Sequence, residues 1–370
     1  MQYIKNNKKF IITYSIISLL GIIAIIFTFN NHSLYKETIA KIISTEEEYV
    51  STDTITYGYH EDIYKQKITA KILNGEDKGK EVTITNEYHK GEAYDQKYKK
   101  GDEIFVSINK RDNDIKNTHI EGYKRDKYII ILIVVFSLTI ILVGHLKGFF
   151  SIISVILNIF LFNIIVMLNG KGLSLPILSF IGSIIFSIIC LTLVSGLNKK
   201  TLSAIISSII GVSVTMLITI IVIHFSEFSG VRFEQMELLT RPYDGIFISE
   251  LILGGLGAIM DISISMSSSL NELIEKDEKI TFKSLTKSGF AIGKDIMSTM
   301  INVLFFTYIC SVIPNLTIYF RNGVEISTLI DQYISLEMTR ALVGAIGITL
   351  TIPIAIYTTL FIYKRRNKEW

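Results

Sequence analysis

Long apolar stretches constrain this chain more than any other feature of its 370-residue sequence. A helix of about 20 apolar residues, rising about 1.5 Å per residue, is long enough to cross the hydrocarbon core of a bilayer. Such runs lie at residues 10–29, 128–144, 149–168, 174–195, 202–225, 246–268, 289–313 and 341–363. The sequence therefore predicts an α-helical integral membrane protein with about eight transmembrane helices.

Residues 31–126 differ in kind, because they contain nearly half of the Asp, Glu, Lys and Arg residues of the chain. Residues 66–73 and 81–85 alternate polar and apolar side chains on either side of the turn 74–80, which predicts a β-hairpin. Residues 37–43 and 100–108 read as two more strands. We predict a small β-barrel domain, resembling an OB-fold, inserted between the first and second spans and closed on itself so that no sheet edge is exposed.

The positions of basic residues predict the topology. The first span has no small-x-small cleavage site after it, so residues 1–30 are expected to remain as a signal-anchor helix. Most Lys and Arg residues of the short loops fall on the side of the N-terminus, although Lys124, Arg125 and Lys127 at the exit of the domain do not. We predict cytoplasmic N- and C-termini, an extracytoplasmic β-rich domain over 31–126, a seven-helix transmembrane domain over 127–365 and a basic cytoplasmic tail over 366–370.

An acidic residue stands in the middle of the span 246–268. Helical spacing places it in a stripe of small or polar residues, which consists of Glu250, Gly254, Gly257, Asp261, Ser265, Ser268 and Glu272. An ionised Asp at the bilayer centre costs about 2.5–3.5 kcal/mol on insertion scales, so Asp261 must face protein or water. Gly254 and Gly257 would let a helix, or an ion with its water, approach the backbone.

The next span carries a second stripe, in which Asp295, Thr299 and Asn302 share one helical face and Lys294 lies beside Asp295. We expect the two stripes to pack together and to form an ion or substrate pathway. The alternative is that Asp261 is structural and bonds to polar groups of neighbouring helices.

Two further features of the sequence predict an outer gate and a close contact between helices. Arg241 and Asp244, at the outer mouth of the Asp261 helix, are hypothesised to form an outer gate by pairing with Glu250 or Arg340. A stripe of small residues in the span 202–225 predicts close helix packing. It consists of Ala204, Ser208, Gly211, Thr215 and Thr219.

Two motifs resemble the signature of the YibE/F-like family of bacterial multi-pass membrane proteins. They are Gly257-Ala-Ile-Met-Asp-Ile-Ser-Ile-Ser-Met-Ser-Ser-Ser-Leu-Asn-Glu-Leu, preceded by Arg241-Pro-Tyr-Asp, and Gly293-Lys-Asp-Ile-Met-Ser-Thr-Met-Ile-Asn. The resemblance implies several spans, an extracytoplasmic segment and a place in the bacterial cytoplasmic membrane, and it names no reaction. The similar family motif has an arginine where this chain has Lys294. Lysine keeps the positive charge, but it cannot make the two parallel hydrogen bonds of a guanidinium group.

Three functional classes follow. The first is a transporter or permease-like protein whose intramembrane carboxylates bind a cation or relay protons. The second is a membrane accessory or assembly protein whose external β-domain binds a partner. The third, an intramembrane aspartyl protease, is disfavoured because Ala-Ile-Met, and not Gly-x-Gly, precedes Asp261.

No metalloprotease, nucleophile-elbow or phosphate-loop motif occurs, so we expect no enzyme activity and no cofactor. The sequence does not define a metal site. The expected partners are the lipid bilayer, an ion or small solute, and a membrane-protein partner or a second copy of the chain, but not nucleic acid.

Overall fold

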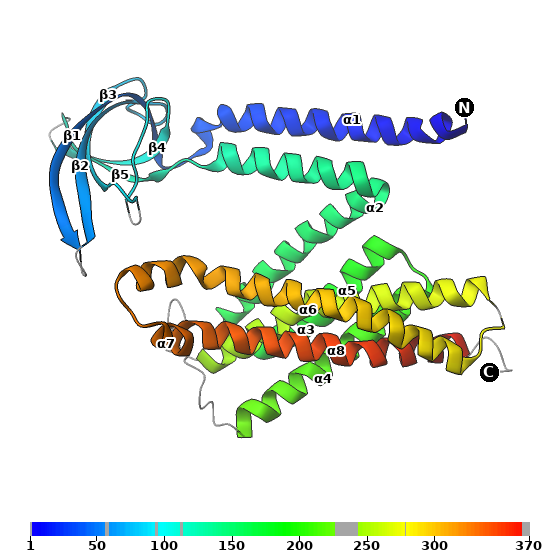
Figure 1. The fold of residues 1–370 in the computed structure, drawn as a ribbon. Coiled ribbons are helices and arrows are strands. Elements are labelled where there is room, and N and C mark those ends of the chain that lie inside the picture. The colour runs from blue at the N-terminus through cyan, green and yellow to red at the C-terminus, as the bar shows by residue number, and fades with distance from the viewer. Residues whose placement is uncertain are drawn as a thin grey trace. The chain divides into compact units, whose positions relative to one another are not determined.

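The computed structural model describes residues 2–55, 59–92, 95–111, 114–225, 243–277 and 279–364. The chain forms two compact units, which comprise residues 1–146 and 147–370. Figure 1 shows the helices and strands of each unit.

The first unit contains a helix that leads into an antiparallel sheet. Helix α1 (Gln2–Phe29) and a short turn η1 (His32–Leu34) precede five strands, which are β1 (Thr38–Ile55), β2 (Tyr59–Ile72), β3 (Glu81–His89), β4 (Glu103–Arg111) and β5 (Asp114–Tyr123). The strand order is β3-β2-β1-β4-β5. The predicted hairpin is confirmed, because β2 and β3 pair from Ile63 with His89 to Lys71 with Glu81.

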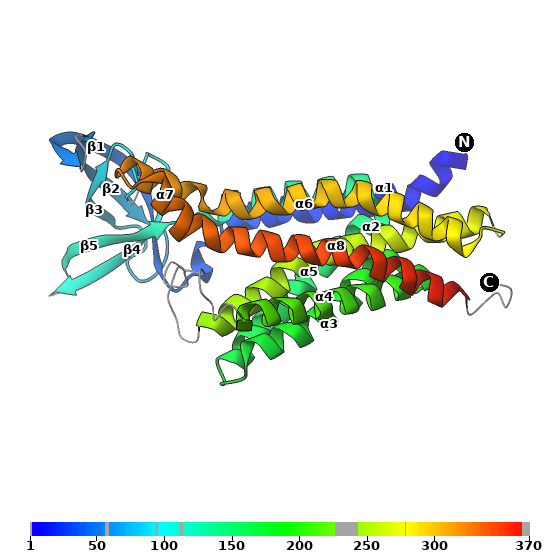
Figure 2. The ribbon, with the colours of Figure 1, turned by 60° about the horizontal axis from the view of Figure 1, so that its bottom comes forward.

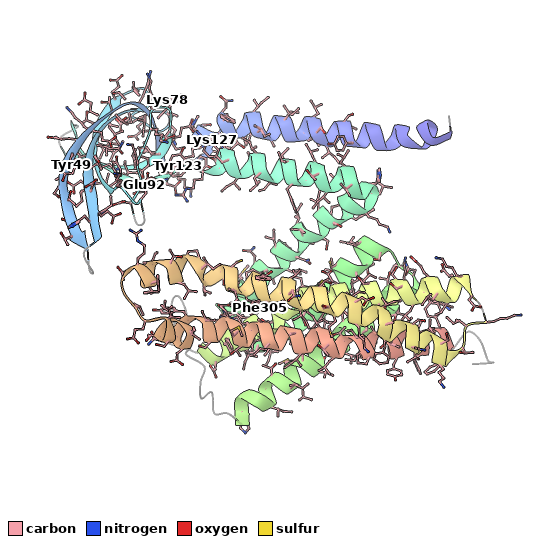
Figure 3. All side chains as sticks on the ribbon, in the orientation of Figure 1. Tyr49, Lys78, Glu92, Tyr123, Lys127 and Phe305 are labelled. Carbon is pink, nitrogen blue, oxygen red and sulfur yellow. The ribbon has the colours of Figure 1, made fainter. Side chains whose placement is uncertain are left out.

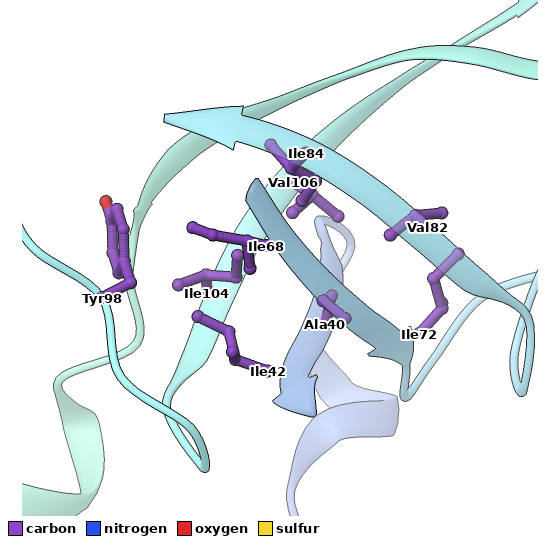
Figure 4. Close-up of a cluster of buried hydrophobic side chains, with 10 residues drawn as sticks. Ala40, Ile42, Ile68, Ile72, Val82, Ile84, Tyr98, Ile104 and Val106 are labelled. Carbon is purple, nitrogen blue, oxygen red and sulfur yellow. The ribbon is translucent and has the colours of Figure 1, made fainter. Parts of the chain in front are cut away.

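The sheet has its own apolar core. Side chains alternate between buried and exposed along β3, where Val82 and Ile84 point inward. They pack with Ile68, Ile104 and Val106 from the other strands (Figure 4). The alternating sequence pattern thus produces a sheet with one face buried.

The predicted closed barrel is not found. Closure would need a ladder between the edge strands β3 and β5, and none is present among the described residues. Polar side chains instead hold the segment before β4. Gln66 Nε2 donates to the Tyr98 carbonyl at 3.0 Å, and Asn86 Nδ2 donates to the Gln96 carbonyl at 2.9 Å.

A buried lysine joins α1 and the sheet to the next helix. Lys124 is fully buried, and its Nζ lies 2.9 Å from Asp126 Oδ1, 3.6 Å from Glu103 Oε2 and 3.3 Å from the Thr28 carbonyl. Asp126 also accepts a hydrogen bond of 2.8 Å from the Tyr35 hydroxyl. The positive charge of Lys124 is therefore neutralised inside the fold.

Helix α2 (Asp126–Asn169) contains two of the predicted spans, 128–144 and 149–168, within 44 residues. The helix is interrupted at His145, whose φ of 51° and ψ of −130° are not helical. The boundary between the two units follows one residue later, after Leu146.

The second unit is a helical bundle. It contains the rest of α2 followed by α3 (Leu175–Ser195), α4 (Lys199–Phe225), α5 (Tyr243–Lys276), α6 (Phe282–Arg321), α7 (Ile326–Leu329), η4 (Ile330–Ile334) and α8 (Ser335–Lys364). Helix α5 contacts α3, α4, α6 and α8, and α6 runs beside α8 (Figure 2). Ile259, Ile262 and Met266 of α5 are almost completely buried in this bundle.

Small and hydroxyl-bearing residues mediate the closest helix contacts. The predicted packing role of the α4 stripe is confirmed, because all five of its members are buried. A Cβ atom added to Gly211 would lie 2.6 Å from Thr351 Oγ1 of α8. The hydroxyls of Ser203 (α4) and Thr359 (α8) lie 2.7 Å apart, and Ser267 (α5) donates to Ser203 at 3.3 Å.

Many helical hydroxyl groups bind the backbone of their own helix. Each donates a hydrogen bond of 2.7–2.9 Å to the carbonyl four residues earlier, as do Thr28, Thr139, Ser151, Ser187, Thr215, Thr219, Ser249, Thr307 and Thr351. These polar groups are satisfied within a single helix.

Six helices among the described residues are long and apolar enough to cross a membrane, which is fewer than the predicted eight. Two predicted spans share α2, so they count as one helix. The apolar part of α1, Tyr14–Phe29, is a shorter helix. The coarse prediction of several apolar spans is confirmed, whereas the number of crossings stays a prediction.

Candidate functional site

A cleft of about 700 Å³ lies beside one end of α5 in the second unit. Helices α2, α3, α5, α6 and α8 all contribute to its walls. Apolar side chains such as Ile165, Leu175 and Leu253 line most of it. The charged groups at the cleft are Glu250, Glu337 and Arg340.

These three charged residues form one ion-paired group. The Arg340 guanidinium binds Glu250 through Nη2 and Glu337 through Nη1. It also lies over the Phe247 ring, 5.6 Å from the ring centroid. Arg340 Nε is buried and has no hydrogen-bond partner among the described residues.

The charge balance of the group favours a cation. Glu337 is buried, Glu250 is exposed, and a single guanidinium serves both carboxylates. The group therefore carries one negative charge in excess when both carboxylates are ionised. Ser249, Thr307 and the Tyr308 hydroxyl add neutral oxygen atoms to the walls of the cleft.

Gly254 lets α6 approach α5 at the cleft. A Cβ atom at this position would collide with the Tyr308 hydroxyl. The predicted close approach to the Gly254 backbone is therefore made here by a tyrosine side chain. Gly257, one turn further along, has open space where its Cβ would be.

Asp261 lies on the same face of α5 as Glu250, Gly254 and Gly257, and all four residues are exposed in the single chain. Its carboxylate has neither a hydrogen bond nor an ion pair with any of the residues that the structure describes. Ser265 and Ser268 continue the face and are half-buried. The stripe thus leads away from the cleft along α5, on the side opposite the buried Ile259 and Ile262.

The structure does not bring the α6 stripe against the α5 stripe. Lys294, Asp295, Thr299 and Asn302 are exposed, and the last two donate hydrogen bonds of 2.9 Å to carbonyls of their own helix. Apolar side chains make the contact between the helices, among them Met266 and Leu270 of α5. The glycines of α6 face α8, since a Cβ on Gly293 would collide with Ile352.

The structure describes only part of the hypothesised outer gate. Arg241 lies outside the described residues, and Asp244 is exposed at the first turn of α5. Glu250 and Arg340, which were their expected partners, pair with each other. Sequence reasoning missed Glu337 because the predicted span began at 341, but its position three residues before Arg340 on a helix could have indicated the pair.

The site offers no obvious metal centre. Among the described residues, no group of three or more His, Cys, Asp or Glu side chains is arranged to hold a metal ion. The arrangement can bind a cation through two carboxylates and neutral oxygens, or can take up and release protons.

Comparison with protein families gives two matches. The model described as YibE/F-like protein matches residues 132–365, and the model of the YibE/F family N-terminal domain matches residues 33–123. No curated protein and no solved structure matches the chain.

Proposed function

This chain belongs to the YibE/F-like family, and from that premise we propose that it is a membrane permease that moves a cation or protons through its helical unit. The N-terminal sheet is proposed to lie outside the cytoplasmic membrane of a bacterium, with both chain termini in the cytoplasm.

The apolar helices support membrane insertion with eight crossings. A continuous helix of 44 residues would be about 66 Å long at about 1.5 Å per residue, roughly twice the thickness of the hydrocarbon core. The interruption at His145 divides α2 into two apolar halves of suitable length. Helices α1, α3, α4, α5, α6 and α8 supply the other six crossings.

The cleft carries the proposal. Ionisable groups among apolar helices are costly and commonly mark ion or proton pathways. Here Glu250, Glu337 and Arg340 meet in a cleft of about 700 Å³, and the Asp261 face of α5 leads away from it. A structural role for Asp261 would require a partner group, and none is present among the described residues.

In the proposed mechanism, a cation or proton competes with Arg340 for the Glu250 carboxylate. A cation or proton that binds Glu250 weakens its ion pair with Arg340, because it neutralises the same negative charge. The guanidinium then keeps Glu337 as its partner. Glu250 thereby becomes the first binding group, and Asp261 is proposed as the next group along α5.

The open sheet supports a second candidate function. The strands β3 and β5 are sheet edges without a ladder partner among the described residues. An extended segment of another protein could add to such an edge. In that case the N-terminal domain would recruit a partner, and the helices would serve as its anchor and assembly platform.

Ligand-dependent thermal unfolding tests the permease. Wild type, Glu250→Gln and Asp261→Asn are compared over monovalent cations, divalent cations and pH, with Asp277→Asn, at the exposed residue that follows α5, as a control. A ligand at a hundredfold excess over its Kd stabilises the folded state by about 2.7 kcal/mol. We expect one cation class, or a change of pH, to stabilise wild type and the control but neither site variant.

Flux measurements complete the test. Proteoliposomes are loaded with a pH-sensitive dye and given a gradient of the stabilising cation. Asp261→Asn is expected to reduce the flux to the level of empty liposomes. Equal flux through wild type and Asp261→Asn would exclude Asp261 from the pathway, and a binding signal without flux would favour the accessory role.

A further inference from the structure

A second cleft, of about 340 Å³, lies in the first unit where the sheet meets α2. It is lined by Gln96, Tyr123, Arg125, Tyr128, Ile129 and Leu132. Figure 3 labels Tyr123 and Lys127 at this junction. The chain changes here from a charged domain to an apolar helix, so the membrane insertion proposed above would place the cleft at the boundary between water and lipid.

Arg125 is the charged residue that lines this cleft, and no carboxylate among the described residues neutralises its guanidinium. Its exposed guanidinium donates one long hydrogen bond, of 3.4 Å, to Gln96 Oε1. None of the described residues forms an ion pair with it. The nearby carboxylates have other partners, since Asp126 binds Lys124 at 2.9 Å and Asp102 accepts from the Tyr123 hydroxyl at 2.8 Å.

Two tyrosines form the aromatic part of the cleft. The rings of Tyr123 and Tyr128 stack with their centroids 6.4 Å apart, and Lys127 Nζ lies 5.2 Å from the centroid of the Tyr128 ring. Tyrosine is enriched at membrane interfaces because its ring is apolar and its hydroxyl is polar. Arg125 thus lies in the same cleft as two tyrosine rings, and such rings commonly contact lipid headgroups.

An apolar track continues from the cleft along α2. Arg125, Tyr128, Ile129, Leu132 and Phe136 are spaced by 3, 4, 7 and 11 residues from the first, so they share one helical face. The last four side chains are between 54% and 70% exposed within the chain. Along this face a cation is followed by a tyrosine and then by aliphatic and aromatic side chains. A phospholipid has the matching order, from its phosphate through glycerol to the acyl chains.

We propose that this cleft binds one anionic phospholipid, with the phosphate on Arg125, the glycerol region against Tyr123 and Tyr128, and an acyl chain along Ile129, Leu132 and Phe136. Arginine suits a phosphate because its planar fork makes two parallel, charge-assisted hydrogen bonds. The exposed apolar track favours a lipid over a soluble phosphate, which would leave that track uncovered. The proposal rests on the membrane insertion proposed above, but not on transport.

Native mass spectrometry of the full-length protein in detergent tests the site. The protein is titrated with phosphatidylglycerol, phosphatidylcholine or glycerol 3-phosphate. The variants are Arg125→Gln, Arg125→Lys and Leu132→Gln, and the matched control is Lys36→Gln, which removes an exposed positive charge from the same domain outside the cleft. The Arg125 side chain forms only one long hydrogen bond with the described residues, so its variants are expected to fold. Thermal unfolding of each variant in the absence of lipid verifies this.

We expect wild type and Lys36→Gln to retain one phosphatidylglycerol in preference to phosphatidylcholine. Arg125→Gln should weaken that binding about tenfold, as expected for the loss of charge-assisted hydrogen bonds. Arg125→Lys should recover part of it, and Leu132→Gln should weaken both lipids. Equal retention of both lipids by wild type, or equal binding by wild type and Arg125→Gln, would overturn the proposal. Glycerol 3-phosphate binding as tightly as the lipid would overturn the lipid as the occupant.

Discussion

Lys124 and Asp261 show two different fates of a charged side chain close to apolar surroundings. Lys124 is buried and surrounded by Asp126, Glu103 and the Thr28 carbonyl, whereas Asp261 is exposed and has no partner among the described residues. The sequence predicted that Asp261 would face protein or water, because insertion into lipid is costly. It did not predict that Lys124 would be buried, since Glu103 and the Thr28 carbonyl reach it from segments that are distant along the chain, and only Asp126 lies nearby in sequence.

Replacing Lys124 with methionine should destabilise the junction between α1, the sheet and α2. The change keeps most of the length of the side chain but leaves two carboxylates without their cation, and breaking a buried ion pair in this way costs about 3 kcal/mol. Hydrogen exchange of the β4 and β5 amides measures the loss. Lys36→Met, in the exposed segment before β1, should leave exchange unchanged, and equal protection in both variants would contradict the role of Lys124.

The stability of the end of β3 should depend on pH through His89. The Asp95 carboxylate, 2.5 Å from His89 Nδ1, raises the pKa of the imidazole above its ordinary value of 6.5. A raised folded-state pKa contributes stability that is complete below the ordinary value and is lost as the pH rises through the raised one. Amide protection near His89, corrected for intrinsic exchange, should therefore fall across that window. A profile that is the same in wild type and His89→Gln would refute this dependence.

At the scale of single elements, the periodicity of the sequence predicted secondary structure and packing faces, but it did not predict which elements lie against each other. Alternation in residues 66–85 identified the β2–β3 hairpin, and the small residues of α4 identified its packing face. The predicted barrel is not found because alternation within single strands does not specify whether the two edge strands, β3 and β5, pair with each other. The predicted contact between the stripes of α5 and α6 is absent among the described residues, because apolar side chains on other faces of these helices pack together and against α8.

Glycine substitutions separate the packed and open faces of these helices. In Gly293→Ala the new methyl group collides with Ile352, and overpacking of this kind costs about 1–3 kcal/mol. In Gly257→Ala nothing lies within 4 Å of the new methyl group, so no loss of stability is expected. Thermal unfolding of the two purified variants decides the matter. A larger loss in Gly257→Ala would mean that the Asp261 face of α5 is covered.

At the scale of the whole molecule, the sequence predicted a charged domain over residues 31–126 followed by an apolar helical region, whereas the two compact units of the structure meet after Leu146. The candidate site was only partly predictable from the sequence. Glu250 and Asp261 were found by the spacing within one helix, but Glu337 and Tyr308 join the cleft from α8 and α6. Such residues depend on how the helices pack, and a single sequence without tertiary contacts does not specify that packing.

Cysteine labelling tests the topology of the whole chain. Cys190 and Cys310 are replaced by serine, and single cysteines are introduced at Lys78 and Lys147, both of which are exposed. A membrane-impermeant thiol reagent added to intact cells should label the Lys78 variant, while the Lys147 variant should require permeabilised cells. Labelling of both positions from the same side would contradict the two crossings proposed for α2.

The hydroxyl groups that bind carbonyls of their own helix have a consequence for biosynthesis. A nascent helix that leaves the translocon with Thr139, Ser187 or Thr215 already bonded to its own backbone exposes few unsatisfied polar groups to lipid. With the membrane insertion proposed above, each helix can therefore enter the bilayer before its neighbours have been synthesised. Contacts such as that between Ser203 and Thr359, which are 156 residues apart, can then form late, after both helices are in place.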